Sequence, residues 1–198
     1  MRHTLSRRAV IAAAAATAAA AATVVATPAA NAETLAGTFS IDSGSYFRMI
    51  LPSGSTSGPF LANGNSTNSD KTITPLSGSL TSGSYQGQVT AARTFFGSDF
   101  VTSTKATDPQ TGSATSVPTI TRNGSSLSGD LSAFGVAWNG QVFNQGAPKP
   151  GGGLPGKTSR VTGTINGSSY SITWTSQIVG GPFNNFTGLW HLTGTYSK

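Results

Sequence analysis

Apolar and polar residues alternate along most of the chain after residue 32, in a pattern that occurs three times. In each copy an aliphatic-Ser/Thr-Gly-x-aliphatic run is followed a little further on by aromatic-x-Gly/Ser-Gln-Val/Ile. The copies occupy 76–80 with 85–89, 127–131 with 138–142, and 161–165 with 174–178. Successive side chains of a strand point to opposite faces, so this alternation is typical of half-buried strands. Each copy therefore predicts two sequential strands of an antiparallel β architecture.

The same alternation predicts further strands, and helical periodicity is absent after residue 32. Asn-Gly pairs at 123–124, 139–140 and 166–167 indicate tight hairpin turns, because Asn and Gly both tolerate positive φ. Strand number and spacing predict an all-β fold, either a closed antiparallel β-barrel or, as the alternative, a β-sandwich. The expected strands cover 37–42, 46–51, 72–76, 84–89, 100–104, 118–121, 127–138, 141–144, 160–165, 170–179 and 188–196.

Glycine recurs inside the aliphatic runs, although it weakens a strand interior. A glycine within a strand commonly marks a bulge, a sharp bend or the close approach of another group. Its repetition favours a strongly coiled sheet, and hence a barrel or a tightly bent sandwich. The positions are Gly37, Gly78, Gly129, Gly163 and Gly194.

Residues 1–32 predict a cleavable signal peptide that precedes the fold. Arg2, Arg7 and Arg8 come before an Ala-rich apolar run, and residues 30–32 (Ala-Asn-Ala) form a small-x-small cleavage pattern. Residues 6–11 resemble a twin-arginine signal, while the general secretory route stays open. An uncleaved membrane anchor is the less favoured alternative, because Ala is a weak membrane former. We therefore expect a secreted, extracellular protein with one all-β domain at 33–198 and no stable membrane span after signal cleavage.

Charge and composition narrow the function classes. The chain has twelve Lys and Arg and six Asp and Glu; three of the arginines belong to the predicted signal, which leaves nine basic residues and a net charge of +3. These basic residues are scattered, so the sequence predicts no nucleic-acid partner. Cysteine is absent, so packing and a hydrogen-bonded sheet have to stabilise an exported chain without disulfides.

Few residues suit catalysis or metal binding. His191 is the only histidine after residue 32, which is too few nitrogen ligands for a zinc site. Oxygen-bearing residues alternate at 63–70, but they include a single carboxylate, so a solvated loop is a better interpretation than a calcium site. The aspartates lie mostly in turn contexts, and no Gly-x-Ser-x-Gly motif is followed by an acid and a histidine. We predict no catalytic residue, no metal, no cofactor and no enzymatic activity.

The best functional signal is a set of aromatic and amide residues near the C-terminus. Flat apolar rings beside directional amides suit sugars, peptides or small amphipathic ligands. The alternative is that Phe183 and Phe186 pin their loop to the core. Alternation places His191 on the more polar face of its strand. The candidate ligand-binding residues are Phe183, Asn184, Asn185, Phe186, Trp190 and His191.

Three segments carry a family resemblance. Residues 174–188 (WTSQIVGGPFNNFTG), 45–49 (SYFRM) and 107–112 (TDPQTG) resemble a group of small exported proteins of actinobacteria. The resemblance extends over most of the predicted mature chain. It implies extracellular placement, and it brings no activity or assigned functional residue.

These observations favour a secreted, non-catalytic binding protein for a small amphipathic molecule or a glycan, at the cell envelope or in the medium. In a ligand-holding barrel an inward face would bear Gln86, Gln88, Gln141 and Gln177. Three alternatives stay open. A secreted inhibitor of an extracellular enzyme would present the Pro-Gly loop 147–157, a structural envelope protein would self-associate through strand edges, and a hydrolase would need His191 beside an acid.

Overall fold

A computed structural model describes residues 31–54, 72–73 and 77–198 of the chain. The predicted signal peptide, apart from Asn31 and Ala32, and the stretch 63–70 considered for calcium lie outside the described residues. The regular secondary structure of the described part consists of antiparallel strands and one short 3-10 turn at Pro150–Gly152. The all-β class predicted from the alternation is confirmed.

The strands fall into two sheets. The larger sheet has ten strands in the order β1-β8-β9-β12-β13-β14-β2-β5, with β3 paired to β14 and β4 paired to β3. The smaller sheet has the order β11-β10-β7-β6. The strands are β1 Glu33–Leu35, β2 Gly37–Ile41, β3 Tyr46–Ile50, β4 Thr72–Ile73, β5 Gly78–Ser82, β6 Arg93–Phe95, β7 Ser98–Thr104, β8 Thr119–Asn123, β9 Ser126–Asp130, β10 Phe134–Trp138, β11 Gln141–Asn144, β12 Ser159–Asn166, β13 Ser169–Gln177 and β14 Thr187–Ser197.

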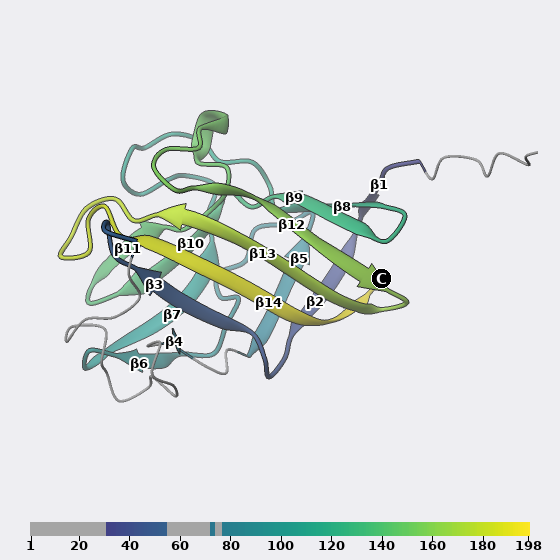
Figure 1. The fold of residues 1–198 in the computed structure, drawn as a ribbon, viewed down its shortest axis with the longest axis horizontal. Coiled ribbons are helices and arrows are strands. Elements are labelled where there is room, and N and C mark those ends of the chain that lie inside the picture. Colours follow the sequence, from purple (N-terminus) through teal and green to yellow (C-terminus); the bar gives the residue numbers. More distant parts are fainter. Residues whose placement is uncertain (1–30, 55–71, 74–76) are drawn as a thin grey trace, which may run out of the picture.

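The larger sheet curls into a nearly closed barrel, as the sequence predicted. Only Ala36 separates β1 from β2, yet β1 pairs with β8 while β2 pairs with β14. One stretch of chain therefore links the first strand of this order to the last but one, β2, which is followed only by β5. Figure 1 shows the four strands of the smaller sheet toward the end of the molecule opposite β1 and β8.

Two expected strands are corrected by the structure. The predicted single strand 127–138 is two strands, because the chain turns after β9 and enters the other sheet as β10; Phe134 N–H donates to Leu131 O (2.9 Å) across this turn. Leu131, Ala133 and Phe134 are all buried, so the apolar pattern continues through the turn and conceals it.

The predicted strand 84–89 is not a regular strand. It is a bridge between the two sheets, because Val89 O accepts from Ser79 N–H (2.8 Å) and Val89 N–H donates to Thr102 O (2.7 Å). A segment with one partner on each side satisfies its backbone groups without joining a ladder.

The repeated strand glycines have a common physical reason, which is close approach. A Cβ added at Gly163 would lie 2.0 Å from Ser171 O, a backbone atom of the neighbouring strand. The other four glycines likewise place their Cα against a backbone carbonyl of an adjacent segment. The tight coiling inferred from the sequence therefore rests on positions where only glycine fits.

The core between the two sheets is strongly aromatic. Trp174 of β13 and Trp190 of β14 are 1 % and 0 % exposed and stack at 5.7 Å with an interplanar angle of 10°. Phe134 of β10 packs edge-on against both rings, at 5.2 and 4.9 Å. These contacts fix the smaller sheet against the barrel wall.

The edge of the smaller sheet is covered by a side chain. Gln110 Nε2 donates to Val142 O, and Asn144 N–H donates to Gln110 Oε1 (2.7 Å). The carboxamide thus takes the place of a peptide group of a further strand beside β11. Asp108 holds this loop, since Gln110 N–H donates to Asp108 Oδ1 (2.9 Å).

Candidate ligand-binding mouth

The connection between β13 and β14 folds over the end of the two sheets and carries Phe183. Ile178 N–H donates to Phe186 O (2.7 Å), and Asn185 N–H donates to Ile178 O (2.9 Å), which closes the loop at its base. Asn184 Oδ1 accepts from Gly180 N–H (2.8 Å) and fixes the tip. Asn185 adopts φ 67°, a left-handed conformation that Asn tolerates better than most residues. The loop thereby turns the Phe183 ring toward the sheets.

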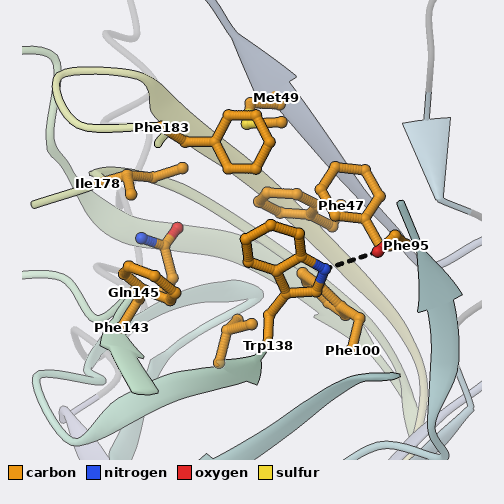
Figure 2. Close-up of a pocket in the computed structure, with 10 residues that line it drawn as sticks. Phe47, Met49, Phe95, Phe100, Trp138, Phe143, Gln145, Ile178 and Phe183 are labelled. Atoms are coloured by element: carbon orange, nitrogen blue, oxygen red, sulfur yellow. Dashed lines mark hydrogen bonds between the residues drawn. The ribbon is translucent and has the colours of Figure 1, made fainter. Parts of the chain in front are cut away.

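A small cavity of about 30 Å³ lies beneath this loop, between the two sheets. Figure 2 shows its lining side chains, which come from both sheets and from the loop. Gln145 is the one polar residue of the lining, in the part of the chain that the structure describes. The walls are Phe47, Met49, Phe95, Phe100, Val136, Trp138, Phe143, Gln145, Ile178 and Phe183.

An open groove of about 440 Å³ lies outside the cavity. Its lining is Phe96, Ser98, Trp138, Asn139, Pro182, Phe183 and Phe186. Phe183 and Trp138 line both the groove and the cavity, and their ring centroids are 5.4 Å apart. These two rings therefore separate an outer compartment from an inner one. We call the two compartments and the rings between them the mouth.

The rings of the mouth are held in place by the hairpin turns of the smaller sheet. Trp138 Nε1–H donates to Phe95 O (2.6 Å), which fixes the indole and leaves its faces for packing. Phe96, in the turn between β6 and β7, has φ 48°, an unusual conformation for an aromatic residue. In this conformation the Phe96 ring packs edge-on against Phe95, with ring centroids 4.7 Å apart, and lies 5.8 Å from the Phe183 ring.

Gln145 lies beside the inner cavity, which its polar atoms do not face. It follows β11 and is 2 % exposed. Its backbone O accepts from Trp174 Nε1–H (2.9 Å), and its Oε1 accepts from Trp190 Nε1–H (3.3 Å). The stacked tryptophans of the core therefore hold both the backbone and the carboxamide of Gln145.

A buried lysine supports the same corner of the chain. Lys149 Nζ donates to Asn144 O (2.6 Å) and to Asn144 Oδ1 (3.3 Å). Burial lowers the pKa of Lys149 to about 8, while the negative charge of Asp108 opposes part of that shift. The ammonium group thus holds Asn144, the residue before Gln145, through two hydrogen bonds.

The structure brings only part of the predicted site to the mouth. Phe183 and Phe186 both line the groove, and each is half-buried. Asn184 caps its own loop, and Asn185 Oδ1 accepts from Gln177 Nε2 (3.1 Å), so both amides are bound within the loop region. Both phenylalanines also pack against the core, as the alternative interpretation expected, and the Phe183 ring lies 6.0 Å from Phe95. Their part in ligand binding stays a prediction.

Trp190 and His191 lie away from the mouth. Trp190 was a candidate ligand-binding residue, but its side chain is fully enclosed by the core and lines neither compartment of the mouth. His191 points to the other face of β14, as alternation predicted, and stacks on Tyr46 with ring centroids 5.0 Å apart. Burial lowers the pKa of His191.

The four glutamines proposed for an inward face do not line the cavity among the described residues. Gln86 Nε2 donates to Ser79 O (3.1 Å), Gln88 Nε2 donates to Thr90 O (3.1 Å), and Gln141 is exposed. Gln177, as described above, holds Asn185. The amides of Gln86, Gln88 and Gln177 therefore bind backbone and loop groups.

Sequence reasoning missed Phe96 and the outer position of Trp138. The signal for Phe96 is the sequence Phe95-Phe96-Gly97, because a strand can bury only one of two successive side chains on one face. The signal for Trp138 is its place directly before the Asn139-Gly140 turn, where a hairpin ends and a side chain meets solvent.

Three further observations concern metal binding, membrane spanning and charge in the described residues. They contain no group of three or more His, Cys, Asp or Glu side chains that could hold a metal ion. None of their helices is long and apolar enough to cross a membrane. Charged side chains are absent from the described lining of both compartments of the mouth. Comparison with known protein families, curated proteins and solved structures finds no match to this chain.

Proposed function

We propose that this chain is a secreted, non-catalytic binding protein that takes up a small, largely apolar molecule at the mouth. The observation that carries this proposal is the position of Phe183 and Trp138, which line an open groove and an apolar cavity at once. Partly exposed aromatic rings that cluster around a pocket are typical of ligand-binding sites. Single exposed apolar side chains are common on protein surfaces and indicate no such site.

The groove has the size and chemistry for this role. Its volume of about 440 Å³ lies in the range of small-molecule sites, roughly 300–1,000 Å³. Four half-buried rings, those of Phe96, Trp138, Phe183 and Phe186, offer flat apolar surface. Ser98 and Asn139 add a hydroxyl and a carboxamide at the rim. An amphipathic ligand would place its apolar part on the rings and its polar part at this rim.

A titration with N-phenyl-1-naphthylamine, a neutral probe whose fluorescence rises in apolar surroundings, tests the proposal. We expect saturable binding to the mature protein and a loss of roughly tenfold in affinity for Trp138→Ala, because an aromatic anchor of a binding site contributes that much or more. Tyr85→Ala is the matched control, since Tyr85 is an exposed ring that lines neither compartment. Equal affinity of the Trp138→Ala and Tyr85→Ala proteins would refute the proposal.

A glycan is the second candidate ligand, favoured by the polar pair at the groove rim. Ser98 Oγ and Asn139 Oδ1 are 3.3 Å apart beside the Trp138 ring. Sugars combine an apolar ring face with hydroxyls, which suits a ring with adjacent polar groups. Affinity electrophoresis in gels containing neutral polysaccharides separates the candidates: a glycan site loses retardation in Asn139→Ala, while probe binding stays unchanged. The inhibitor, envelope and hydrolase alternatives stay predictions.

A further inference from the structure

Three adjoining hollows lie at one end of the smaller sheet. The cavity and the groove of the mouth share Trp138 and Phe183. A third hollow, an open groove of about 540 Å³, shares Ser98, Trp138 and Asn139 with the groove of the mouth. Trp138 therefore lines all three hollows. We call the third one the outer-face groove, and the rest of its lining is Asp99, Val101, Ala137, Gly140, Gln141 and Val142.

The inner cavity presents only apolar atoms to a ligand. Its one polar lining residue, Gln145, uses its carboxamide elsewhere, since Oε1 accepts from Trp190 Nε1–H and Nε2 donates to Asn144 O. A cavity without polar partners does not hold ordered water, but it accepts apolar guests. The volume of about 30 Å³ has room for roughly two water-sized groups, such as the last carbons of a hydrocarbon chain.

The outer-face groove carries a negative charge. Asp99 of β7 is exposed and is the one charged side chain among the described residues that line the three hollows. Its cross-strand partner is Thr94, whereas Arg93 pairs with the buried Phe100 and so lies on the opposite face of the sheet. Within the β6–β7 hairpin the carboxylate of Asp99 is therefore left without a cation.

Trp138 and Asp99 together suit a positively charged group. An ammonium ion is attracted both by a carboxylate and by the face of an indole ring. Between this groove and the cavity lie the aromatic rings of the mouth and the polar pair formed by Ser98 and Asn139. From the cavity outward, the surroundings thus change from purely apolar, through aromatic with a polar rim, to negatively charged.

We propose that the mouth and the outer-face groove bind an amphipathic amine, with its hydrocarbon end in the inner cavity and its ammonium group beside Asp99. This inference rests on the proposed function and names the class of ligand. The chain passes between Trp138 and Phe183, whose ring belongs to a loop and can move aside without disturbing a strand. A carboxylate head would be repelled by Asp99. A polar group at the far end would lose its hydrogen bonds to water inside the cavity.

Three probes with the same chain test the charged end. Decylamine, 1-decanol and decanoate differ in their head groups, and at pH 7 the first carries a positive charge and the last a negative one. Isothermal titration calorimetry of the mature protein, below the micelle concentration of each probe, should give the highest affinity for decylamine. We expect decylamine to bind roughly five- to tenfold more tightly than decanoate, because attraction in one case and repulsion in the other combine at an exposed carboxylate.

Two variants of equal net charge assign this preference. Asp99→Asn keeps the shape of the side chain and should make decylamine and decanoate bind equally, while 1-decanol binding stays unchanged. Asp42→Asn is the matched control, since it removes the same charge at an exposed position that lines none of the three hollows. It should keep the preference. Added salt should reduce the preference of the wild type, because it screens exposed charges.

A fourth probe tests the apolar end. 10-Amino-1-decanol has the same ammonium head as decylamine and carries a hydroxyl at the other end of the chain. Its affinity should be about tenfold lower or less, because the hydroxyl finds no hydrogen-bond partner in the inner cavity. Equal affinities of decylamine and 10-amino-1-decanol would show that the chain does not end in the cavity and would overturn the inference.

The remaining outcomes separate this inference from the proposed function. If decylamine, 1-decanol and decanoate bind equally, and Trp138→Ala weakens all three, the mouth binds ligands but Asp99 does not select them. A preference for decylamine that survives Asp99→Asn would also overturn the inference. Absence of binding by all four probes and by N-phenyl-1-naphthylamine would overturn the inference and the proposed function together.

Discussion

The barrel core and the mouth are built from the same aromatic residue types but differ in what surrounds them. Trp174 and Trp190 lie in the middle of long strands and are enclosed on all sides. Trp138 lies at the end of β10, and the ring that packs on it comes from a loop. Both kinds of indole have a bonded N–H. What distinguishes the mouth is therefore incomplete enclosure, because rings held by turns and loops can separate without unfolding the sheet.

The largest expected effect is the stability difference between two tryptophans. Trp190→Ala should lower the free energy of unfolding by about 3–5 kcal/mol, because it empties a fully buried ring site. Trp138→Ala should lower it by clearly less, since its ring is partly exposed. Urea unfolding followed by circular dichroism measures both. Equal losses would break the distinction between core and mouth.

The next effect concerns the glycines that bring barrel strands together. Gly163→Ala should lower the free energy of unfolding by about 1–3 kcal/mol, because the new Cβ would meet Ser171 O at 2.0 Å. Gly87→Ala is the matched control from another copy of the repeat, where a Cβ meets nothing within 4 Å and φ is not positive. It should be neutral or slightly stabilising. Thermal unfolding of both proteins compares them, and a neutral Gly163→Ala would remove close approach as the explanation.

A smaller effect on stability is expected at the mouth itself. Phe183→Ala should lower the free energy of unfolding by about 1 kcal/mol, as is common for partly exposed residues. It should also speed the entry of N-phenyl-1-naphthylamine in stopped-flow mixing, because the ring between the compartments is gone. Phe186→Ala, which borders only the groove, should leave the entry rate unchanged. Equal entry rates in all three proteins would show that Phe183 does not gate the cavity.

The smallest expected effect is a pH dependence of the free energy of unfolding that arises from Lys149. The lowered pKa of Lys149, about 8, means that the folded protein loses this proton before the unfolded chain does. Unfolded chains then bind more protons, so stability should rise between about pH 8 and 10, on the order of 1 kcal/mol. Burial raises the pKa of Tyr170, with a further contribution from Asp42, so above about pH 10 the unfolded chain loses the phenol proton first and stability falls.

Denaturant titrations from pH 7 to 10 test this dependence. The Lys149→Met protein should show no such rise, because methionine keeps the apolar stem and has no titrating group. A parallel course of the two proteins over this range would contradict the assignment of the rise to Lys149.

The long strands were predictable because local pattern and global structure agree in them. The alternation at 160–165, 170–179 and 188–196 became β12, β13 and β14, joined by hairpins or short loops. The division of 127–138 was not predictable, since residues buried in two different sheets read as one apolar run. The repeated strand pattern and its glycines were enough to predict the barrel from the sequence.

The mouth was predictable only in part. Phe183 and Phe186 stand out in a Gly-Pro-rich loop, and the structure places both at the groove. Trp190 was wrongly assigned to the site because alternation shows that a tryptophan faces inward. It does not show whether the ring meets a cavity or a packed core. Gln145 contacts Trp190 and Phe96 contacts Phe183, and these neighbours are distant in the chain, so no local pattern predicts either position.

The carboxamide of Gln110 has a consequence beyond the single molecule. An uncovered strand edge acts as a template on which another copy can extend the sheet, and this is how many β proteins begin to form fibrils. Gln110 occupies that template at β11 with a mimic of a peptide group. Concentrated solutions of the protein should therefore not polymerise through β11, and any assembly into an envelope layer would have to begin at a different edge.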